Sequence, residues 1–254
     1  MRDPLTLISP YSSSEEAAQV LAQSLTQAML AKGDCPFHLA ISGGSTPKRL
    51  FEILGISTIG QRLPWHRLVI YWADERCVPT DHPDSNHGML MSAIGGDLPH
   101  HELTYHRIHG EDAPRREVLR YAQLLRDNVP GTPLPQLDWI WLGMGLDGHV
   151  ASLFPESVLE EEPHGICGIS TNPYSGEQRI TLTEAMIMAA KQVTFLVTGH
   201  AKAEIVQRVL TASAADSVLP AARITYRHSK VDWLLDMEAA STLPVGEATP
   251  PRHL

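Results

Sequence analysis

Short apolar runs, each long enough for one buried strand, alternate along most of this 254-residue chain with segments of helical periodicity. We expect strands near 37–42, 68–73, 138–142, 166–170, 179–183 and 193–198, and helices near 13–33, 46–54, 86–94, 113–128, 184–190, 200–211 and 230–240. Strands that alternate with helices build parallel sheets, because a parallel connection must cross over the sheet and a helix supplies the crossover. The sequence therefore predicts an α/β fold with a doubly wound, largely parallel, Rossmann-like sheet flanked by helices.

The turn after the predicted strand at 138–142 carries two side chains suited to proton transfer. Three of the six residues at 143–148 are glycines, which permit a tight turn, and the turn presents Asp147 and His149. In open α/β sheets ligands bind at the carboxyl ends of the strands, where this turn lies. A carboxylate beside an imidazole favours acid–base chemistry. A structural turn with an exposed histidine is the alternative interpretation.

The same glycines also fit the G-x-G-x-x-G pattern of dinucleotide-binding proteins. The pattern lies in mid-chain, however, and no acidic residue ends a clear next strand about twenty residues further on, as that fingerprint requires. The sequence therefore predicts no dinucleotide site, and we expect no cofactor.

A small-residue loop follows the predicted strand at 37–42. Residues 42–47 read Ser-Gly-Gly-Ser-Thr-Pro; Thr46 is a good N-cap and Pro47 suits the first helical position, so a helix should begin here. Free N–H groups at a helix start and glycine backbone bind phosphate well. The candidate phosphate contacts are Gly43, Gly44, Ser45 and Thr46. The P-loop pattern is absent, so nucleoside triphosphate chemistry is not implied, and an ordinary capped turn fits the same residues.

A third polar segment follows the predicted strand at 68–73. Asp74, Glu75 and Arg76 end this strand, and Pro79 stops regular structure soon after. As in the other two loops, charged residues at the carboxyl end of a strand indicate a loop that belongs to the site. A solvated surface turn is the alternative interpretation. We expect the three loops to share one crevice.

Together these segments closely resemble the motifs of the 6-phosphogluconolactonases, a branch of the superfamily that also holds the glucosamine-6-phosphate deaminases. The matching segments are 42–47, 74–79 with Ser85 and Asn86, and 142–155, and similarity continues through 179–183, 197–203 and 219–223. The resemblance implies a fold of the sugar-phosphate isomerase type and hydrolysis of 6-phospho-D-glucono-1,5-lactone to 6-phospho-D-gluconate in the oxidative pentose phosphate pathway. It also implies that Lys202 binds the phosphate and that Arg179 contacts the substrate. From the local sequence alone, an exposed helical lysine and a surface arginine at the start of a strand are the alternative interpretations.

Two details favour the lactonase branch. Deaminases carry an Ala-Phe-Asn-Glu-Pro type sequence after Asp-Gly-His and a tyrosine after Asp-Glu, whereas this chain has Ala-Ser-Leu-Phe-Pro at 151–155 and Arg76. A glucosamine-6-phosphate deaminase/isomerase and a non-catalytic sugar-phosphate sensor are the alternative functions. The chain departs from the family at 225–230, where a turn with proline and glycine is expected before Trp233.

The chemistry of a lactone assigns roles to the candidate residues. Hydrolysis needs a water made nucleophilic, and His149 is the best general base because imidazole titrates near neutral pH. Asp147 would orient or charge-stabilise that imidazole. Arg76 would hold a substrate carbonyl or hydroxyl, and Asp74 would position the base or another hydroxyl. We expect no metal, because H-E-x-x-H is absent and the histidines at 100, 101, 106 and 109 lie in a polar stretch.

Composition narrows the partners. A formal charge of −9 argues against nucleic acid and an anionic membrane surface, but local cations can still bind a phosphorylated sugar lactone. The three cysteines have no C-x-x-C spacing, which argues against a disulfide framework or a zinc site. No apolar run reaches membrane-spanning length, so we expect a cytoplasmic enzyme. We expect a monomer or a small homo-oligomer, and the sequence does not choose between them. Residues 1–241 should form one α/β catalytic domain, and the proline-containing residues 242–254 a flexible tail.

Overall fold

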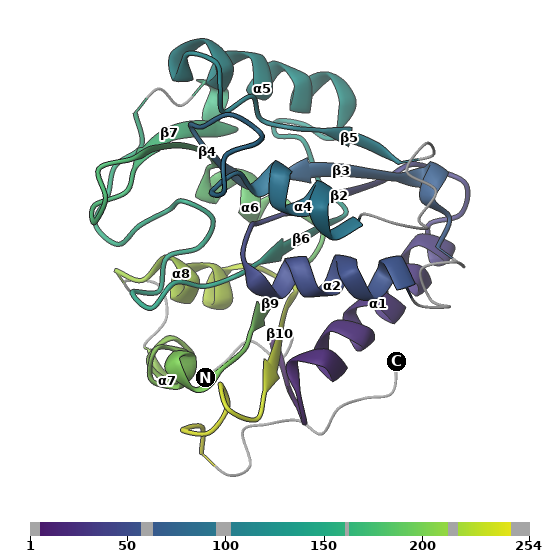
Figure 1. The fold of residues 1–254 in the computed structure, drawn as a ribbon, viewed down its shortest axis with the longest axis vertical. Helices are drawn as coiled ribbons and strands as arrows, with labels where there is room; N and C mark the ends of the chain where they lie inside the picture. Colours follow the sequence, from purple (N-terminus) through teal and green to yellow (C-terminus); the bar gives the residue numbers. More distant parts are fainter. Residues whose placement is uncertain (1–5, 57–62, 95–102, 161–162, 213–217, 245–254) are drawn as a thin grey trace.

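The computed structural model describes residues 6–56, 63–94, 103–160, 163–212 and 218–244, and its centre is a seven-stranded sheet (Figure 1). The strands lie in the order β1-β10-β9-β6-β2-β3-β5, and every pair is parallel. Their bounds are β1 Thr6–Tyr11, β2 Phe37–Ile41, β3 Leu68–Trp72, β5 Thr104–His106, β6 Trp139–Leu142, β9 Val193–Val197 and β10 Val231–Asp236. The predicted doubly wound α/β fold is confirmed.

A second sheet of three antiparallel strands extends from the end of β3. It contains β4 (Asp74–Arg76), β8 (Gln178–Leu182) and β7 (Cys167–Thr171), in that order. The backbone N–H of Leu182 donates to the carbonyl of Ala73 at 2.7 Å and so joins this sheet to the main one. The sequence predicted two of these strands but not the third, because Asp74–Arg76 is too short and too charged to show a strand pattern.

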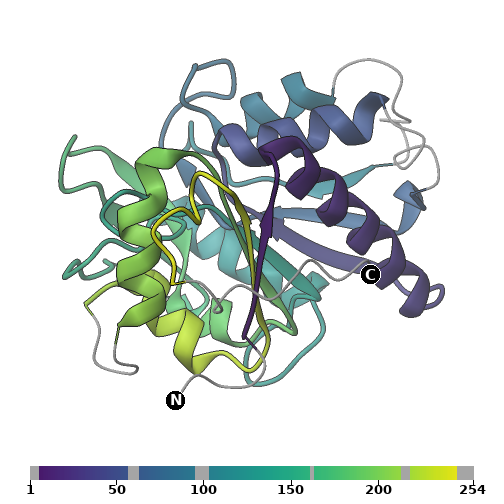
Figure 2. The same cartoon turned by 90° about the horizontal axis from the view of Figure 1, so that it is seen from below.

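Helices cover both faces of the main sheet (Figures 1 and 2). Helices α1, α2 and α4 pack side by side on one face of the sheet. Helices α5, α6, α7 and α8 belong to the connections that cross the other face. Their bounds are α1 Ser14–Ala31, α2 Ser45–Ile56, α4 Asn86–Ile94, α5 Pro114–Asn128, α6 Glu184–Met188, α7 Ala203–Thr211 and α8 Pro220–Arg227, with short 3₁₀ turns η1 Trp65–Arg67, η3 Pro163–Gly165 and η4 His200–Lys202.

The predicted helix at 230–240 is wrong. Residues 231–236 form strand β10, which pairs in parallel with β1 and β9, and its Trp233 stacks on Phe195 at 4.2 Å between ring centroids. A short apolar run fits a buried strand as well as a buried helix, so periodicity alone does not separate them. The sequence analysis also missed β1 and helix α8, which begins with Pro220 in its first turn.

The segment at 225–230, where the chain departs from the family, ends α8 and turns into β10. His228 is 2% exposed, its Nε2 lies 2.9 Å from the carbonyl oxygen of Ala190, and its Nδ1 accepts from the N–H of Lys230 at 3.0 Å. The imidazole therefore ties this turn to the neighbouring connection between α6 and β9.

Helix α2 begins at Ser45, one residue before the predicted N-cap Thr46. Gly44 precedes it with φ +123°, in a region that side chains other than glycine's rarely adopt. The side chains of Ser45 and Thr46 lie outside the described part of the structure, so their predicted hydroxyl contacts stay predictions.

The buried carboxylate of Asp138 connects segments at the amino ends of the strands. Asp138 accepts hydrogen bonds from Lys32 Nζ at 2.5 Å, from Lys191 Nζ at 2.9 Å and from the N–H of His38 at 2.8 Å. Burial by itself would raise the pKa of this carboxyl, but the hydrogen bonds from Lys32, His38 and Lys191 outweigh it and lower that pKa below its usual value. Asp138 therefore links α1, β2 and the start of β9.

We expect Asp138→Asn to lower the free energy of unfolding by about 1–3 kcal/mol at pH 7, the usual effect of losing charged hydrogen bonds. Because the pKa of the carboxyl is lowered in the folded protein, its contribution is complete above about pH 5 and is lost as the pH falls through the folded value. Urea unfolding of both proteins at several pH values measures this, with exposed Asp127→Asn as control. A loss at about pH 2, below the usual carboxyl pKa, that is as large as the loss at pH 7 would contradict the assignment.

The end of the described chain packs against the fold. Thr242 Oγ1 donates to the carbonyl of Ala203 at 2.8 Å, and Leu243 lies against the core. Within the described ranges, no helix is both long and apolar enough to cross a membrane.

Candidate active site

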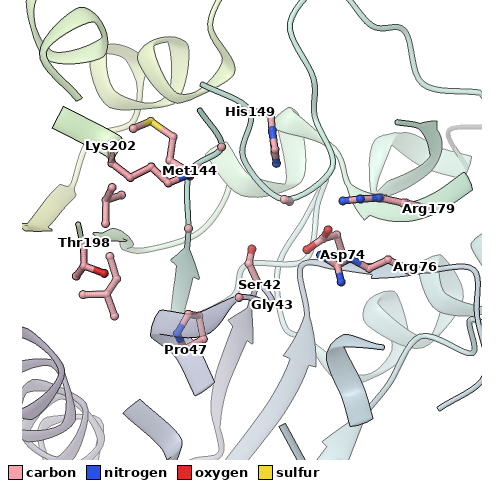
Figure 3. Close-up of a pocket in the computed structure, with 16 residues that line it drawn as sticks. Ser42, Gly43, Pro47, Asp74, Arg76, Met144, His149, Arg179, Thr198 and Lys202 are labelled. Atoms are coloured by element: carbon pink, nitrogen blue, oxygen red, sulfur yellow. The ribbon is translucent and has the colours of Figure 1, made fainter. Parts of the chain in front are cut away.

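Four adjacent strands, β9, β6, β2 and β3, end at one edge of the sheet, and the segments that follow them build one pocket. β2 and β6 are neighbours at the point where the strand order reverses, which is where open α/β sheets bind ligands. The pocket has a volume of about 270 Å³ (Figure 3). It is lined by Ser42, Gly43, Gly44, Pro47, Asp74, Arg76, Gly143, Met144, Gly145, His149, Ala151, Arg179, Leu196, Val197, Thr198 and Lys202.

The turn after β6 forms the predicted carboxylate–imidazole pair. His149 Nδ1 lies 2.6 Å from Asp147 Oδ1, which also accepts the backbone N–H of His149 at 3.1 Å. A Cβ atom at Gly145 would lie 2.1 Å from His149 Nδ1, so only glycine leaves room for the imidazole. Gly148 has φ +80°, which lets the chain reverse between the two side chains.

The electrostatics of this pair keep the carboxyl ionised. Burial raises the pKa of Asp147, but the hydrogen bond from the His149 N–H, the charge of His149 and the hydroxyl of Tyr174 outweigh that effect and lower it. With Nδ1 held by the carboxylate, Nε2 is the ring nitrogen left to act on a ligand. Figure 3 shows the imidazole pointing into the pocket.

The glycine loop after β2 lies beside this turn. A Cβ atom at Gly43 would meet the Oδ1 of Asn86 at 1.7 Å, so the loop can pass Asn86 only because residue 43 has no side chain. Asn86 Nδ2 in turn donates to the carbonyl of Asp74 at 2.8 Å, which fixes the β2 and β3 loops together. Ser42 is 4% exposed, and its buried Oγ has no hydrogen-bond partner among the described residues. The loop thus offers backbone and a hydroxyl to a ligand.

Lys202 reaches the pocket from the segment after β9. Its Nζ donates to the carbonyl of Met144 at 2.7 Å, in the turn that carries His149. Burial lowers the pKa of this ammonium, while the charge of Asp147 raises it. A cation that loses hydration in this way is stabilised when an anionic ligand binds beside it. Figure 3 places Lys202, Met144 and Thr198 on one side of His149.

Two arginines lie on the other side. Arg76 on β4 and Arg179 on β8 are directly opposite in the antiparallel ladder, an unfavourable arrangement for like charges. Burial, and then the charge of Arg76, lower the pKa of Arg179, and the buried Nε atoms of both guanidinium groups lack a partner among the described residues. The Arg179 guanidinium lies 5.7 Å from the ring centre of Phe154. This pair is suited to an anionic or strongly polar ligand.

Asp74 is 3% exposed and lines the pocket beside these arginines. Its Oδ2 accepts a 2.7 Å hydrogen bond from Ser152, whose own carbonyl accepts from Ser170 at 2.6 Å. Among the described side chains, Asp74 is hydrogen-bonded to Ser152 and not to His149. Its orientation is therefore set by buried hydroxyls.

The structure brings eight of the ten predicted site residues into one region: seven line the pocket, and Asp147 holds His149 from behind. For the remaining two, Ser45 and Thr46, only the backbone is described, in the first turn of α2. Sequence reasoning missed Ser42, Ser152 and Phe154. They lie within the family-like segments 42–47 and 142–155, but their contacts depend on partners distant in the sequence. It missed Tyr174 altogether, because nothing local marks that residue.

Glu75 and Cys77, near the site in sequence, have other surroundings. Glu75 is 2% exposed and accepts the N–H groups of Asn86 and His87 at 2.8 Å each, so it caps helix α4; burial raises its pKa. Burial raises the pKa of Cys77 to about 11, so its thiol is a poor nucleophile at neutral pH.

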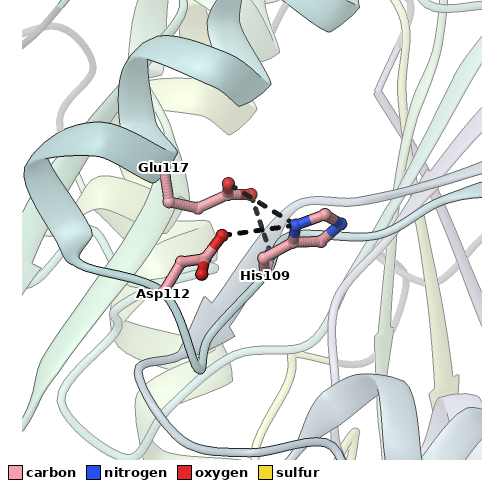
Figure 4. A group of neighbouring side chains, drawn as sticks. All are labelled: His109, Asp112 and Glu117. Atoms are coloured by element: carbon pink, nitrogen blue, oxygen red, sulfur yellow. Dashed lines mark hydrogen bonds and ion pairs between the residues drawn. The ribbon is translucent and has the colours of Figure 1, made fainter.

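Outside the pocket, one group among the described side chains has the composition of a metal site: His109, Asp112 and Glu117 (Figure 4). His109 Nδ1 lies 3.6 Å from Asp112 and 4.0 Å from Glu117. Glu117, however, already accepts hydrogen bonds from Arg120 Nε at 2.6 Å and from the N–H of His109 at 2.7 Å. We therefore assign this group a structural role: its contacts hold the start of α5 in place. His100 and His101 lie outside the described residues.

Comparisons with known proteins agree with the geometry. The family model described as glucosamine-6-phosphate isomerases/6-phosphogluconolactonase matches residues 9–233. A 6-phosphogluconolactonase of Haemophilus influenzae is 38% identical over 208 residues, 82% of this chain and 88% of that protein. The human 6-phosphogluconolactonase is 35% identical over 245 residues, 94% of each chain. The structure of the Trypanosoma brucei 6-phosphogluconolactonase has a TM-score of 0.79 at 28% identity and covers 94% of this chain and 99% of that one.

Proposed function

This chain belongs to the family of glucosamine-6-phosphate isomerases and 6-phosphogluconolactonases, and on that premise we propose that His149 is the general base of a lactone hydrolase. The activity is hydrolysis of 6-phospho-D-glucono-1,5-lactone to 6-phospho-D-gluconate in the oxidative pentose phosphate pathway. The observation that carries the assignment of His149 is its 2.6 Å contact with Asp147 inside a pocket that also contains Gly43, Gly44 and Lys202.

In the proposed reaction His149 Nε2 takes a proton from water as the water oxygen bonds to the lactone carbonyl carbon. Asp147 holds Nδ1 and stabilises the imidazolium that forms. The resulting tetrahedral oxyanion collapses, and the bond from this carbon to the ring oxygen breaks. The ring oxygen takes up the proton that His149 received from the water, which returns the imidazole to its free form. No covalent intermediate with the protein is needed, because a δ-lactone is already an activated ester.

The charge that develops on the carbonyl oxygen needs a cation, and we assign this role to Arg76. Arg179, opposite Arg76 in the ladder, would contact the same end of the substrate and later the product carboxylate. Asp74, oriented by Ser152, would accept a hydrogen bond from a sugar hydroxyl. Bringing an anionic group between the two arginines would also relieve their mutual repulsion.

The phosphate would lie at the other end, against the backbone of Gly43 and Gly44 and the ammonium of Lys202. The amino terminus of α2, which follows this loop, contributes a favourable dipole. Three cations and one carboxylate, that of Asp74, line the pocket, so its local charge is positive although the chain carries −9. This accounts for binding of an anionic substrate to an acidic protein.

The remaining expectations stay proposals. We propose a cytoplasmic enzyme that needs no cofactor and is a monomer or a small homo-oligomer. We also propose that residues 1–241 form its single α/β catalytic domain. The three cysteines are free thiols, which supports a reducing compartment.

Freshly prepared 6-phosphogluconolactone tests the function directly. We expect acid release far above the spontaneous rate measured without protein, and no ammonia when glucosamine 6-phosphate is supplied. Ammonia release would indicate the deaminase reaction. A sugar-phosphate sensor would bind 6-phosphogluconate in calorimetry yet leave the lactone decaying at its background rate.

A further inference from the structure

Tyr174 contacts the Asp147–His149 pair from a hairpin distant in the sequence. Its hydroxyl donates a 2.9 Å hydrogen bond to Asp147 Oδ2, while the other oxygen, Oδ1, faces His149. Tyr174 is 74% exposed, so its ring gains little from burial. The hydrogen bond from the hydroxyl to the carboxylate thus ties this side chain to the body of the protein.

The tip of the hairpin holds the backbone of Tyr174 in place. Asn172 Oδ1 accepts the N–H of Tyr174 at 2.9 Å and that of Ser175 at 3.4 Å, and the carbonyl of Asn172 accepts the N–H of Gly176 at 2.8 Å. Gly176 has φ +74°, which allows the turn to close. This side-chain turn leads from β7 into β8, the strand that carries Arg179.

We propose that Tyr174 is a positioning residue for the hydrolysis: it fixes the Asp147 carboxylate and shares its charge, and so sets how readily His149 accepts a proton. The inference rests on the proposed function of His149 as the base. A carboxylate that also accepts a hydroxyl stabilises a neighbouring imidazolium less than a carboxylate without that donor. Tyr174 therefore favours the free imidazole that general-base catalysis requires.

The protonation of the phenol is consistent with this function. The hydrogen bond to Asp147 raises the pKa of Tyr174, so the hydroxyl remains a donor throughout the working pH range. Other groups face the pair as well. Lys202 acts on Asp147 from the start of α7. The ring centre of Phe154 lies 4.7 Å from that of His149 and 5.7 Å from the guanidinium of Arg179. None of these groups is altered when only the phenol oxygen is removed.

Tyr174→Phe tests the proposal because it keeps the ring and deletes the donor. We expect kcat to fall about 3- to 10-fold, the effect of one ordinary hydrogen bond, with KM within about 2-fold of the parent value. The acid limb of kcat against pH should move to higher pH, since imidazolium is then favoured. Ser175→Ala, which loses a hydroxyl from the same turn, is the matched control. It should change neither kcat nor the position of the acid limb.

A second measurement separates this inference from the function of His149. The His149 ring can be titrated by NMR in the absence of substrate, and its midpoint should rise in Tyr174→Phe and stay unchanged in Ser175→Ala. An unchanged midpoint and pH profile overturn the proposal even if the enzyme is slower, because the loss is then merely structural. An effect confined to KM also overturns it. A shifted midpoint together with full activity of His149→Ala would uphold the coupling and reject the general base instead.

Discussion

Replacing His149 with alanine is expected to lower kcat for 6-phosphogluconolactone by about 10²- to 10⁴-fold, the usual contribution of a positioned general base. The imidazole is held by Asp147 at 2.6 Å and points into the pocket, so no other described side chain replaces its Nε2 at the same place. The lactone also hydrolyses spontaneously, and this rate must be subtracted at each substrate concentration. KM should change much less than kcat, because the base acts mainly in the transition state.

Two further variants sharpen this result. His66→Ala removes an exposed imidazole from η1, which precedes the first residue of β3, whereas the pocket lies at the carboxyl ends of the strands. This variant should retain parent activity. Asp147→Asn keeps the size of the side chain but removes the charge that stabilises imidazolium, so we expect a smaller loss than in His149→Ala. Near-parent hydrolysis by His149→Ala would show that another group activates the water.

Lys202→Ala is expected to raise KM for the phosphorylated lactone by about 10- to 100-fold, which corresponds to the loss of one charged hydrogen bond. Its kcat should remain within about 3-fold, because the phosphate is bound alike in the ground state and the transition state. Steady-state kinetics on 6-phosphogluconolactone measure both quantities. Lys230→Ala removes an exposed lysine that does not line the pocket and directly precedes the first residue of β10, and it serves as the control.

The unphosphorylated lactone shows which end of the substrate Lys202 binds. Glucono-1,5-lactone lacks the phosphate, so Lys202→Ala and the parent should hydrolyse it with equal kcat/KM. Arg179→Ala, assigned to the lactone end, should instead impair hydrolysis of both substrates. Equal losses on both lactones in Lys202→Ala would contradict phosphate binding by this residue and place it at the ring.

The sequence alone was sufficient for the α/β class and for the three loops of the site. Each strand that feeds the pocket is a short apolar run, and each loop begins with small or charged residues next to it, so the signal is local. The pair of Asp147 and His149 could be recognised for the same reason: one turn carries both. Residues 231–236 could not be assigned correctly, because their apolar run fits two kinds of structure. Only the pairing of β10 with β1 on one side and with β9 on the other selects the strand.

Contacts between distant segments required the tertiary structure. Arg76 faces Arg179 only because β4 and β8 pair, and Tyr174 reaches Asp147 only because the β7–β8 hairpin turns beside the loop after β6. Local sequence specifies backbone angles and which faces are apolar, and these determined the elements and their loops. The choice of partner for each strand depends on burial summed over the whole molecule, and therefore only the folded chain decided which charges meet in the pocket.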